Sequence, residues 1–559
     1  MIDFFKKPDE LVARFKAKNP ETHFDYDEIK HDAHKRVFTI AKMMNLDLLK
    51  DMQNSLTKAF HNGVTFDEWK KDIIPHLKKS GWWGEIEVDD PKSGKPKKVF
   101  VGARRLKRIF AAAGSAVGVG NLWRFPYLAA KDGGGVFLLI YLLLVFTVGF
   151  VLLTNDLAIG RRTGRSAIYA YESIRKKWKF LGIITFLVPV IIMTYYAVIG
   201  GWILKYIALF LNGNVDVAAQ NNCFSNFISS KNSVYYSLVF MALTAIIVYS
   251  GVDKGIERVS KIIMPILLVM IIGIAIYSLT LKTTTDNGQV RTGLQGLAIY
   301  LKPDLTGMNI SRFLQISLDA MSQLFFSLSV SMGIMITYGS YVNKDVDLQK
   351  SVSLIELMDT GVAIIAGVMI IPAIYVFSGV DGMSAGPGLM FISLPKVFSQ
   401  MLAGRFIGFV FFVLAAFAAL TSCISVLESL VANYIEILNA QRQRATVVVS
   451  IIYLIATAII ALGYSVFYVE VILPNGSTGQ LLDIMDYISN SFMMPFISFL
   501  SSIFIGWVIG PKWIIEEVER NNKAFNRKVL YTFVVKYCLP IIMFILFLQS
   551  TGLFNYFKG

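Results

Sequence analysis

A glycine-rich stretch beginning at Gly114 has the residue types and spacing of an ion-binding site. Residues 114–126 combine small, amide, cationic and imino residues, namely Gly114, Gly118, Gly120, Asn121, Arg124 and Pro126. In lipid a helix is interrupted only where it is buried in protein or borders a cavity, and such a break offers carbonyls to a cation and a helix N-terminus to an anion. A glycine-rich packing surface is the alternative, but packing alone does not account for Asn121, Arg124 and Pro126.

A second interruption is predicted at Gln323–Gly333, where hydroxyl side chains and a glycine fall in the middle of an apolar segment. One helical serine can bond to its own backbone and would carry no information. Four hydroxyls in this region indicate a lined cavity, and they belong to Ser322, Ser327, Ser329 and Ser331.

Acidic and hydroxyl residues inside other apolar segments are further candidates. Asp359 lies between Leu354 and Val368, where a charge costs a few kcal/mol, so it is a candidate functional residue unless it reaches water near a helix end. Thr421 and Ser422 offer hard oxygen ligands that suit Na⁺-like cations. Asp486 is a possible partner of Arg124, and Asp483 is a possible helix cap. Glu428 and Asp156 are further acids without a predicted partner.

The position of Gly118 informs the substrate class. A carboxylate side chain at this position could bind the amine of a substrate, but glycine has no side chain. A cavity with a cation site and no acid at this point suits a substrate that brings its own carboxylate. The sequence therefore favours amino acids over monoamines.

The elements that must position these residues are membrane helices. The 559-residue chain is 55% hydrophobic with a mean hydropathy of +0.55 and only 17% charged residues, which predicts an all-α polytopic membrane protein. Apolar segments long enough to cross a bilayer predict about eleven spans, at 109–130, 136–159, 180–211, 234–250, 259–281, 312–341, 353–378, 398–435, 446–468, 480–509 and 530–555.

The net charge of +15 is assigned to membrane topology rather than to nucleic-acid binding. Lys and Arg gather in alternate connections, including 161–165, 175–177 and 523–528, which predicts that these connections are cytoplasmic. We therefore expect a multi-pass protein of the bacterial inner membrane with the N-terminus inside and the C-terminus outside.

Residues 1–104 are polar and Lys-rich and predict a small, soluble, mostly helical cytoplasmic segment, followed by a transmembrane domain at 105–559. Residues 89–98 are expected to be an exposed turn or linker. All five histidines lie in the first segment. The membrane part has no histidine, no metal-ligand cluster and no base paired with a nucleophile, so an enzyme is not expected and no organic cofactor is implied.

The motifs Gly114–Tyr127, Gly133–Phe137, Gln323–Ser329 and Leu420–Ser422 resemble neurotransmitter:sodium symporters of the bacterial amino-acid type, over about residues 109–555. The resemblance implies two inverted five-helix repeats, at about 109–281 and 312–509, with a final helix at 530–555. The first and sixth spans would be unwound at their centres. The implied function is Na⁺-coupled symport of a neutral amino acid into the cell by alternating access.

The resemblance also implies the roles of individual residues. Two Na⁺ ions would be bound by Gly114, Ala116, Val117, Asn121, Ser327, Asp359, Ala418, Thr421 and Ser422. The amino acid would contact Ser115, Ala116, Val119, Gly120, Ile192, Tyr196, Phe326, Ser327, Ser329, Met332, Ser422 and Val426. Arg124 and Asp486 would form the outer gate, with Phe326 and Tyr196 as its lid.

Three departures from the family pattern carry expectations of their own. Asp359 and Ala363 replace an asparagine and a chloride-binding serine of chloride-dependent relatives, so transport is expected not to need chloride. Met332 replaces a common aromatic residue, so the side-chain preference is left open. In relatives, an N-terminal segment with Arg and Trp holds the inner gate. Glu436 and Tyr341 are the candidate partners of such a segment here. The matching upstream positions, however, are not Arg and Trp.

Residues 25–109 resemble the N-terminal region of phage minor head (Mu F-like) morphogenesis proteins, through Phe38–Lys42, Gly63–Phe66 and Lys79–Gly84 among other matches. The resemblance ends before that family's main domain and brings no catalytic residues. Two alternatives to symport therefore stay open. One is a fusion product that inserts but transports poorly because its inner gate is altered, and the other is a virion-assembly protein. The amino acid, ion stoichiometry and oligomeric state are not specified by the sequence.

Overall fold

The computed structural model describes residues 118–552 apart from 123, 253–255, 285–288, 306, 343, 345, 380–387, 475–477 and 521–523, together with four short strands before residue 118. By its contacts the chain divides into two units, Met1–Leu106 and Lys107–Gly559. The second unit contains all of the described helices.

In the first unit the described residues form two small strand pairs. β1 (Asn19–Pro20) pairs in parallel with β2 (Val37–Phe38), and β3 (Glu85–Asp89) pairs antiparallel with β4 (Pro96–Phe100). The prediction of a linker at 89–98 is therefore wrong at both ends, because residue 89 belongs to β3 and residues 96–98 belong to β4. Alternation of Ile86 and Val88 with acidic residues favours an extended strand there. The helical content expected for residues 1–104 falls outside the described residues.

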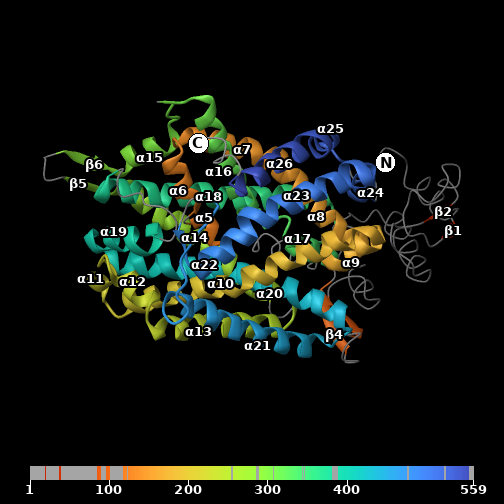
Figure 1. Ribbon diagram of the computed structural model, residues 1–559, viewed down its shortest axis with the longest axis horizontal. Coiled ribbons are helices and arrows are strands. Elements are labelled where there is room, and N and C mark those ends of the chain that lie inside the picture. The colour runs from red at the N-terminus through yellow and green to blue at the C-terminus, as the bar shows by residue number, and fades with distance from the viewer. Residues whose placement is uncertain are drawn as a thin grey trace, which may run out of the picture. The chain divides into compact units, whose positions relative to one another are not determined.

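The second unit is a bundle of membrane helices, as the apolar segments predict (Figure 1). Within the described ranges, nine helices are long and apolar enough to cross a membrane: Gly135–Thr163, Lys176–Leu211, Lys231–Tyr249, Arg258–Thr280, Leu348–Ser378, Gly404–Leu438, Arg442–Tyr464, Leu481–Val508 and Lys528–Ser550. The other two predicted spans are described as shorter helices: α5 and α6, on either side of the undescribed residue 123, and α16 and α17, which are separated by residues 329–333. The total of eleven spans stays a prediction.

The α-helices are α5 Val119–Leu122, α6 Arg124–Lys131, α7 Gly135–Leu144, α8 Phe150–Thr163, α9 Ala167–Ile174, α10 Lys179–Leu211, α11 Val215–Ala218, α12 Cys223–Ile228, α13 Lys231–Tyr249, α14 Glu257–Thr280, α15 Gly293–Leu301, α16 Ile310–Leu328, α17 Ile334–Tyr341, α18 Leu348–Ser378, α19 Leu394–Gln400, α20 Gly404–Leu438, α21 Arg442–Ala461, α22 Leu481–Asp486, α23 Met494–Ile503, α24 Lys512–Val518, α25 Lys528–Phe533 and α26 Leu539–Ser550. Single turns of π-helix join several of these, at Val145–Gly149, Leu389–Ser393, Tyr487–Met493, Phe504–Val508 and Val534–Cys538, and 3₁₀ turns lie at Lys176–Trp178 and Leu462–Tyr464. Two short antiparallel hairpins complete the unit, β5 (Lys282–Thr284) with β6 (Val290–Thr292) and β7 (Val471–Ile472) with β8 (Thr478–Gly479).

Long helices that are distant in sequence pack side by side in this unit. α10 packs against α20 and α13, and α17 packs against α8 (Figure 1). The largest fully buried side chains are aromatic, among them Trp202 and Tyr206 of α10. The interior of the bundle is thus filled by large side chains, and polar residues found there require a specific explanation.

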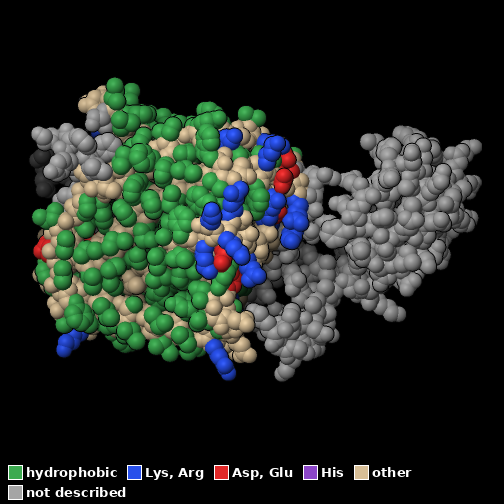
Figure 2. All heavy atoms as spheres, turned by 45° about the vertical axis from the view of Figure 1, so that its right-hand side comes forward, with side chains coloured by type: hydrophobic (Ala, Val, Ile, Leu, Met, Phe, Trp, Pro, Cys, Tyr) green, Lys and Arg blue, Asp and Glu red, His purple; other side chains and the backbone are tan. Residues whose placement is uncertain are grey.

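The surface of the second unit has the composition of a membrane protein. Hydrophobic side chains cover most of the described face in Figure 2, while Lys and Arg side chains gather towards one end. On α21 the exposed apolar residues recur along one helix face: Val447, Val448, Ile451, Ile452, Ile455 and Ile459. Such a face is stable in contact with lipid, and this agrees with the predicted lipid-bilayer environment.

Gly134, in the connection between α6 and α7, is at a position that only glycine can occupy. Its φ is 55°, and a β-carbon would lie 2.2 Å from the carbonyl oxygen of Ile299. The backbone of this connection also donates and accepts hydrogen bonds with the segment after α15, since the N–H of Asp304 donates to the carbonyl of Gly133 at 3.2 Å. The end of α6 is therefore held against the segment that leads into α16.

Candidate functional site

The described part of the first interrupted span begins at Gly118, which precedes α5 and is not helical. The N–H of Gly118 donates to Oδ1 of Asn121 at 2.9 Å, and the N–H of Asn121 donates back to the carbonyl of Gly118 at 3.2 Å. Residues 107–117 lie outside the described residues. They include four of the predicted binding residues, Gly114, Ser115, Ala116 and Val117.

The sixth span is interrupted where the sequence predicted. α16 ends at Leu328 and α17 begins at Ile334, and between them φ is positive at Ser329, Ser331 and Gly333, with values of 53°, 62° and 75°. A residue other than glycine costs about 1–2 kcal/mol in this left-handed conformation. The two serines therefore store strain in the segment, which the surrounding contacts must offset.

Asp156, for which the sequence gave no partner, supports this unwound segment. Its Oδ2 accepts the N–H of Ser331 at 2.9 Å. The hydroxyl of Ser498 donates to the hydroxyl of Ser331 at 2.6 Å. Asp156 on α8 and Ser498 on α23 are both buried, so charge-assisted and neutral hydrogen bonds together hold a strained backbone in an apolar interior.

Three of the predicted Na⁺ ligands, Asn121, Ser327 and Asp359, form one buried cluster. Nδ2 of Asn121 donates to Oδ1 of Asp359 at 2.7 Å and to the hydroxyl of Ser327 at 3.0 Å. The hydroxyl of Ser327 donates to the Asp359 carboxylate, at 2.8 Å from Oδ1 and 2.9 Å from Oδ2. Asp359 is fully buried in the middle of α18. It therefore does not reach water near a helix end.

The donor set of this cluster fits a hard cation. It combines a carboxylate, a hydroxyl and a carboxamide, the oxygen-rich chemistry that such cations prefer. The carboxamide of Asn121 presents Nδ2 to Asp359, while its oxygen accepts from Gly118. The oxygen of Asn121 has a second lone pair, so it can bind a cation while it accepts from Gly118.

The second predicted cation site is described only on the side of α20. Ala418, Thr421 and Ser422 are buried on this helix. The hydroxyl of Thr421 donates to the carbonyls of Phe417 at 3.1 Å and Ala418 at 3.0 Å. The start of α5 lies against this face, because a β-carbon on Gly118 would be 2.6 Å from Oγ of Ser422. The partners expected on the first span, Gly114 and Val117, are outside the described part of the chain.

A cavity of about 30 Å³ lies between α5, α10, α16, α17 and α20. Eight predicted substrate contacts line it: Gly120, Ile192, Tyr196, Phe326, Ser329, Met332, Ser422 and Val426. Gly118, Asn121 and Ile334 line it as well. Ile334 was missed by sequence reasoning, although its position directly after the break could have indicated it. Predicted contacts Val119 and Ser327 are buried beside the cavity without lining it.

Arg124 and Asp486, expected to form the outer gate, are not paired with each other in this structure. Arg124 donates to the hydroxyl of Ser322 at 2.7 Å, and its guanidinium lies over the ring of Phe326, 5.5 Å from the centroid. Asp486 accepts from Tyr195 at 2.9 Å and from Asn490 at 2.5 Å. Arg124 therefore has a local acceptor and Asp486 has local donors, and both residues are half-buried without pairing with each other.

Tyr341 and Glu436, the candidate partners of a missing N-terminal segment, both bond within the second unit. Tyr341 donates to Oε1 of Glu428 at 2.7 Å, and Arg442 pairs with the same carboxylate. Oε1 of Glu436 accepts the N–H of Ser166 at 2.9 Å, directly before α9. Glu428, an acid without a predicted partner, thus joins the ends of α17, α20 and α21.

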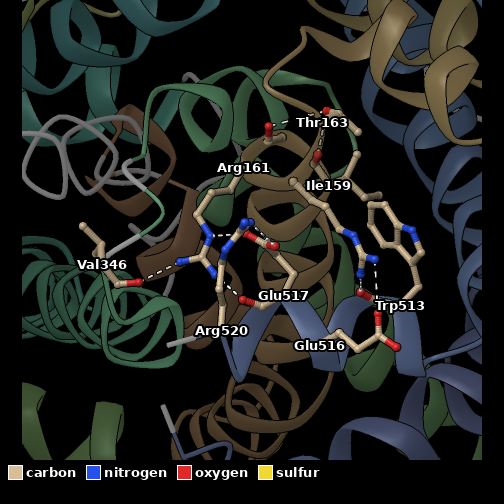
Figure 3. Close-up of polar contacts among 10 residues, drawn as sticks. Ile159, Arg161, Thr163, Val346, Trp513, Glu516, Glu517 and Arg520 are labelled. Atoms are coloured by element: carbon tan, nitrogen blue, oxygen red, sulfur yellow. Dashed lines mark hydrogen bonds and ion pairs between the residues drawn. The ribbon is translucent and has the colours of Figure 1, made fainter. Parts of the chain in front are cut away.

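Two consecutive arginines at the end of α8 fix α24 (Figure 3). Arg161 donates to Oε1 of Glu517 at 2.6 Å, to the backbone carbonyl of Glu517, and to the carbonyl of Val346 at 2.7 Å. Arg162 stacks on the ring of Trp513 and pairs with the exposed Glu516. Arg161 and Glu517 are almost fully buried, so they form a link between α8, α24 and the segment after α17.

A helical membrane protein with a span interrupted between α16 and α17, a buried carboxylate in a polar cluster and a cavity beside the break has the architecture of a secondary transporter. The sequence profile of the sodium:neurotransmitter symporter family matches residues 102–235 and 222–557. The chain belongs to this family. It is a sodium-dependent membrane transporter and not an enzyme.

Relatives of this family cover most of the chain. An uncharacterized sodium-dependent transporter of Bacillus subtilis, YhdH, is 34% identical over 81% of this chain and 98% of its own length. A second, from Haemophilus influenzae, is 31% identical over 80% of this chain and 97% of its own length. The crystal structure of MhsT in complex with L-phenylalanine aligns with a TM-score of 0.70 and 34% identity, over 80% of this chain and 99% of MhsT. The expected fold is confirmed by this likeness.

Proposed function

We propose that this transporter carries a neutral amino acid into the cell together with Na⁺, by alternating access and without a need for chloride. The observation that carries the proposal is an uncharged cavity beside a buried carboxylate. None of the described residues that line the cavity is charged, and Asn121 joins it to Asp359. A zwitterion with an uncharged side chain is the substrate that this environment accommodates at the lowest desolvation cost.

The cavity has a polar side and an apolar side. The hydroxyls of Tyr196 and Ser422 lie near Gly118, 3.4 and 2.6 Å from where its β-carbon would be. Ile192, Met332 and Val426 contribute apolar side chains. We assign the polar side to the amino and carboxylate groups and the apolar side to the side chain. The crystallised complex of MhsT with L-phenylalanine supports an amino-acid substrate of this kind.

The cation cluster couples three helical segments, of which α5 and α16 line the cavity. Asp359 belongs to α18, Ser327 to α16 and Asn121 to α5. A Na⁺ ion bound here would neutralise the carboxylate and replace the hydrogen bonds that it now accepts from the other two residues. A second Na⁺ is assigned to Ala418, Thr421 and Ser422 with the first span. Ligands that bind one conformation more tightly shift the population towards it, which is how ion and substrate together permit closure and opening to the other side.

The proposed chloride independence rests on the carboxylate of Asp359. The carboxylate is fully buried and is within hydrogen-bonding distance of Ser327 and Asn121. It supplies a negative charge beside the Na⁺ ligands without an added anion. Ala363, one turn further along α18 and fully buried, offers no hydroxyl to a chloride ion.

The test is uptake of neutral amino acids into proteoliposomes, with and without an inward Na⁺ gradient, in chloride and in gluconate. We expect accumulation of one class of amino acid only with the gradient and equally in both anions. Uptake that does not depend on Na⁺ would disprove coupling. Loss of uptake in gluconate alone would overturn only the chloride proposal.

We also propose that the protein lies in the bacterial inner membrane, with the loops after α8 and α9 in the cytoplasm. Arg165, Arg175, Lys176 and Lys177 are exposed there, as the positive-inside rule requires. Single cysteines at Lys177 and at Gln220, in the opposite connection, test this orientation. An impermeant thiol reagent added to whole cells should label the second and not the first.

Residues 1–101 precede the family match, and their resemblance to phage head proteins stays a prediction. A fused segment that alters the inner gate would produce a Na⁺ leak without substrate. Currents in proteoliposomes decide this, with a chain lacking residues 1–100 as the comparison. Equal coupling in the two chains would show that the segment has no part in gating.

A further inference from the structure

A cluster of four charged residues joins the end of α6 and the connection after it to the first half of α16. Nζ of Lys131 lies 2.9 Å from Oδ2 of Asp319. Nη2 of Arg312 lies 3.2 Å from Oδ1 of Asp132 and donates to the carbonyl of Lys131 at 2.8 Å. Two neighbouring residues on one segment thus pair with two residues of α16.

The spacing of the two charged residues on α16 favours one position of α6 along that helix. Arg312 and Asp319 are seven residues apart, or about two turns, so they lie on the same face of α16. The charges alternate across the contact, so a shift of α6 along α16 would bring like charges together. α6 carries Arg124, and α16 carries its partner Ser322. The cluster therefore aligns the two half-helices, α6 and α16, that carry Arg124 and Ser322.

Asp132 differs from the other three residues because its side chain is fully buried. Its Oδ2 has no hydrogen-bond partner in the part of the chain that the structure describes. The remaining charged groups of the packed segments are Lys302 and Asp304, which are exposed and whose backbone bonds to the Gly133–Gly135 connection. A carboxylate with one unsatisfied buried oxygen is costly to keep ionised.

Burial and the nearby carboxylate of Asp319 raise the pKa of Asp132 to about 6, against the opposing effect of Lys131 and Arg312. A pKa that is raised in one arrangement means that protonation favours that arrangement, and the preference is lost as pH rises through about 6. In an arrangement that exposes Asp132 to water, its pKa would return towards the ordinary value of about 4. The two arrangements therefore respond differently to pH between 5 and 7.

We propose that Asp132 is a positioning residue that senses protons on the outer side, so that acidification favours the arrangement with α6 and α16 packed around it. From the two pKa values, the ratio of packed to open arrangement should rise about tenfold between pH 7 and pH 5. The inference concerns the movement of the half-helices and does not depend on which amino acid is carried.

The experiment measures the distance between spin labels at Ile310, at the start of α16, and at Val217 on α11. Both side chains are exposed, and the three native cysteines (Cys223, Cys423 and Cys538) are first replaced by serine. Pulsed electron paramagnetic resonance in liposomes at pH 5 and pH 7 gives the populations of the two arrangements. We expect the packed population to be larger at pH 5 than at pH 7, with a midpoint below pH 6 and between the two pKa values.

Three variants separate this role from a general structural one. Asp132→Asn keeps the shape of the buried side chain without its charge, so its packed population should be at least as large as that of the unchanged protein at pH 5 and should not respond to pH. Asp319→Asn should move the midpoint to lower pH, because it removes the charge that raises the pKa of Asp132. Asp304→Asn is the exposed control and should titrate as the unchanged protein does. Titration that persists in Asp132→Asn, or populations that are constant in the unchanged protein, would overturn the proposal.

Discussion

Gly120 and Phe326 are in contact so close that a β-carbon on Gly120 would lie 2.3 Å from the phenylalanine ring. The two residues belong to α5 and α16 and line the same cavity. The ring of Phe326 therefore occupies the space in which a side chain at position 120 would lie. Closure of the cavity depends on this packing as well as on polar contacts.

Gly120→Ala should displace the ring of Phe326 and lower Na⁺-dependent substrate affinity at least tenfold, because the added methyl group cannot be accommodated without movement. Equilibrium binding of a radiolabelled amino acid measures this. Gly361→Ala is the matched control, because nothing lies within 4 Å of the added carbon. Gly120→Ala combined with Phe326→Leu should recover part of the affinity. Unchanged binding by Gly120→Ala would show that the ring is free to move.

Asp359→Asn should weaken Na⁺ binding by an order of magnitude or more, because it removes the only carboxylate among the described cluster residues. The measurement is the Na⁺ concentration that half-saturates substrate binding. Glu356→Gln, a buried acid one turn away that faces Arg527, is the control for loss of any buried charge in α18. An equal effect of both substitutions would argue against a specific ion site at Asp359.

Ser331→Ala should destabilise the protein by about 1 kcal/mol, because it loses the bond to Ser498 while keeping the strained φ of 62°. Ser331→Gly loses the same bond but relieves the strain, so it should be about 1 kcal/mol more stable than the alanine variant. Thermal unfolding of the purified variants in detergent gives the difference. The reverse order of stability would contradict the strain assigned to this position.

Arg161→Ala should cost about 3–5 kcal/mol, because it leaves the buried carboxylate of Glu517 without its principal partner. Arg162→Ala, at the next position, removes an exposed pair and a stacking contact and should cost about 1 kcal/mol or less. Thermal unfolding of the two variants side by side tests the contrast. Similar losses would mean that burial does not distinguish the two arginines.

Both the helices and the elements of the cavity were predictable from the sequence because they depend on local signals. Apolar segments of about twenty residues indicated the spans, and clustered Ser and Gly indicated the break in the sixth span. The family resemblance then placed Asn121, Ser327 and Asp359 together, which the hydrogen bonds among them match. Asp483, predicted as a possible helix cap, caps α22 by accepting the N–H of Gln480.

The polar contacts between distant elements were not predictable, because several groups could satisfy the same charge. Asp486 bonds to Tyr195 and Asn490 instead of Arg124. Glu517 lies 356 positions after Arg161, and nothing in their spacing relates them. Burial of an ion pair depends on how whole helices pack, and a linear pattern does not contain that information.

The position of Asn121 has a consequence for biosynthesis. Its side-chain partners are 206 and 238 residues further along the chain, so the ribosome makes the first span long before the sixth and seventh exist. Until then Oδ1 of Asn121 has its local donor in Gly118, but Nδ2 lies in the nascent membrane segment without these acceptors, which is unfavourable in hydrocarbon. Stable placement of the first span is therefore a late event, completed only after Asp359 has entered the membrane. A chain that stops before this residue would present an unfinished first helix to the quality-control proteases of the cell.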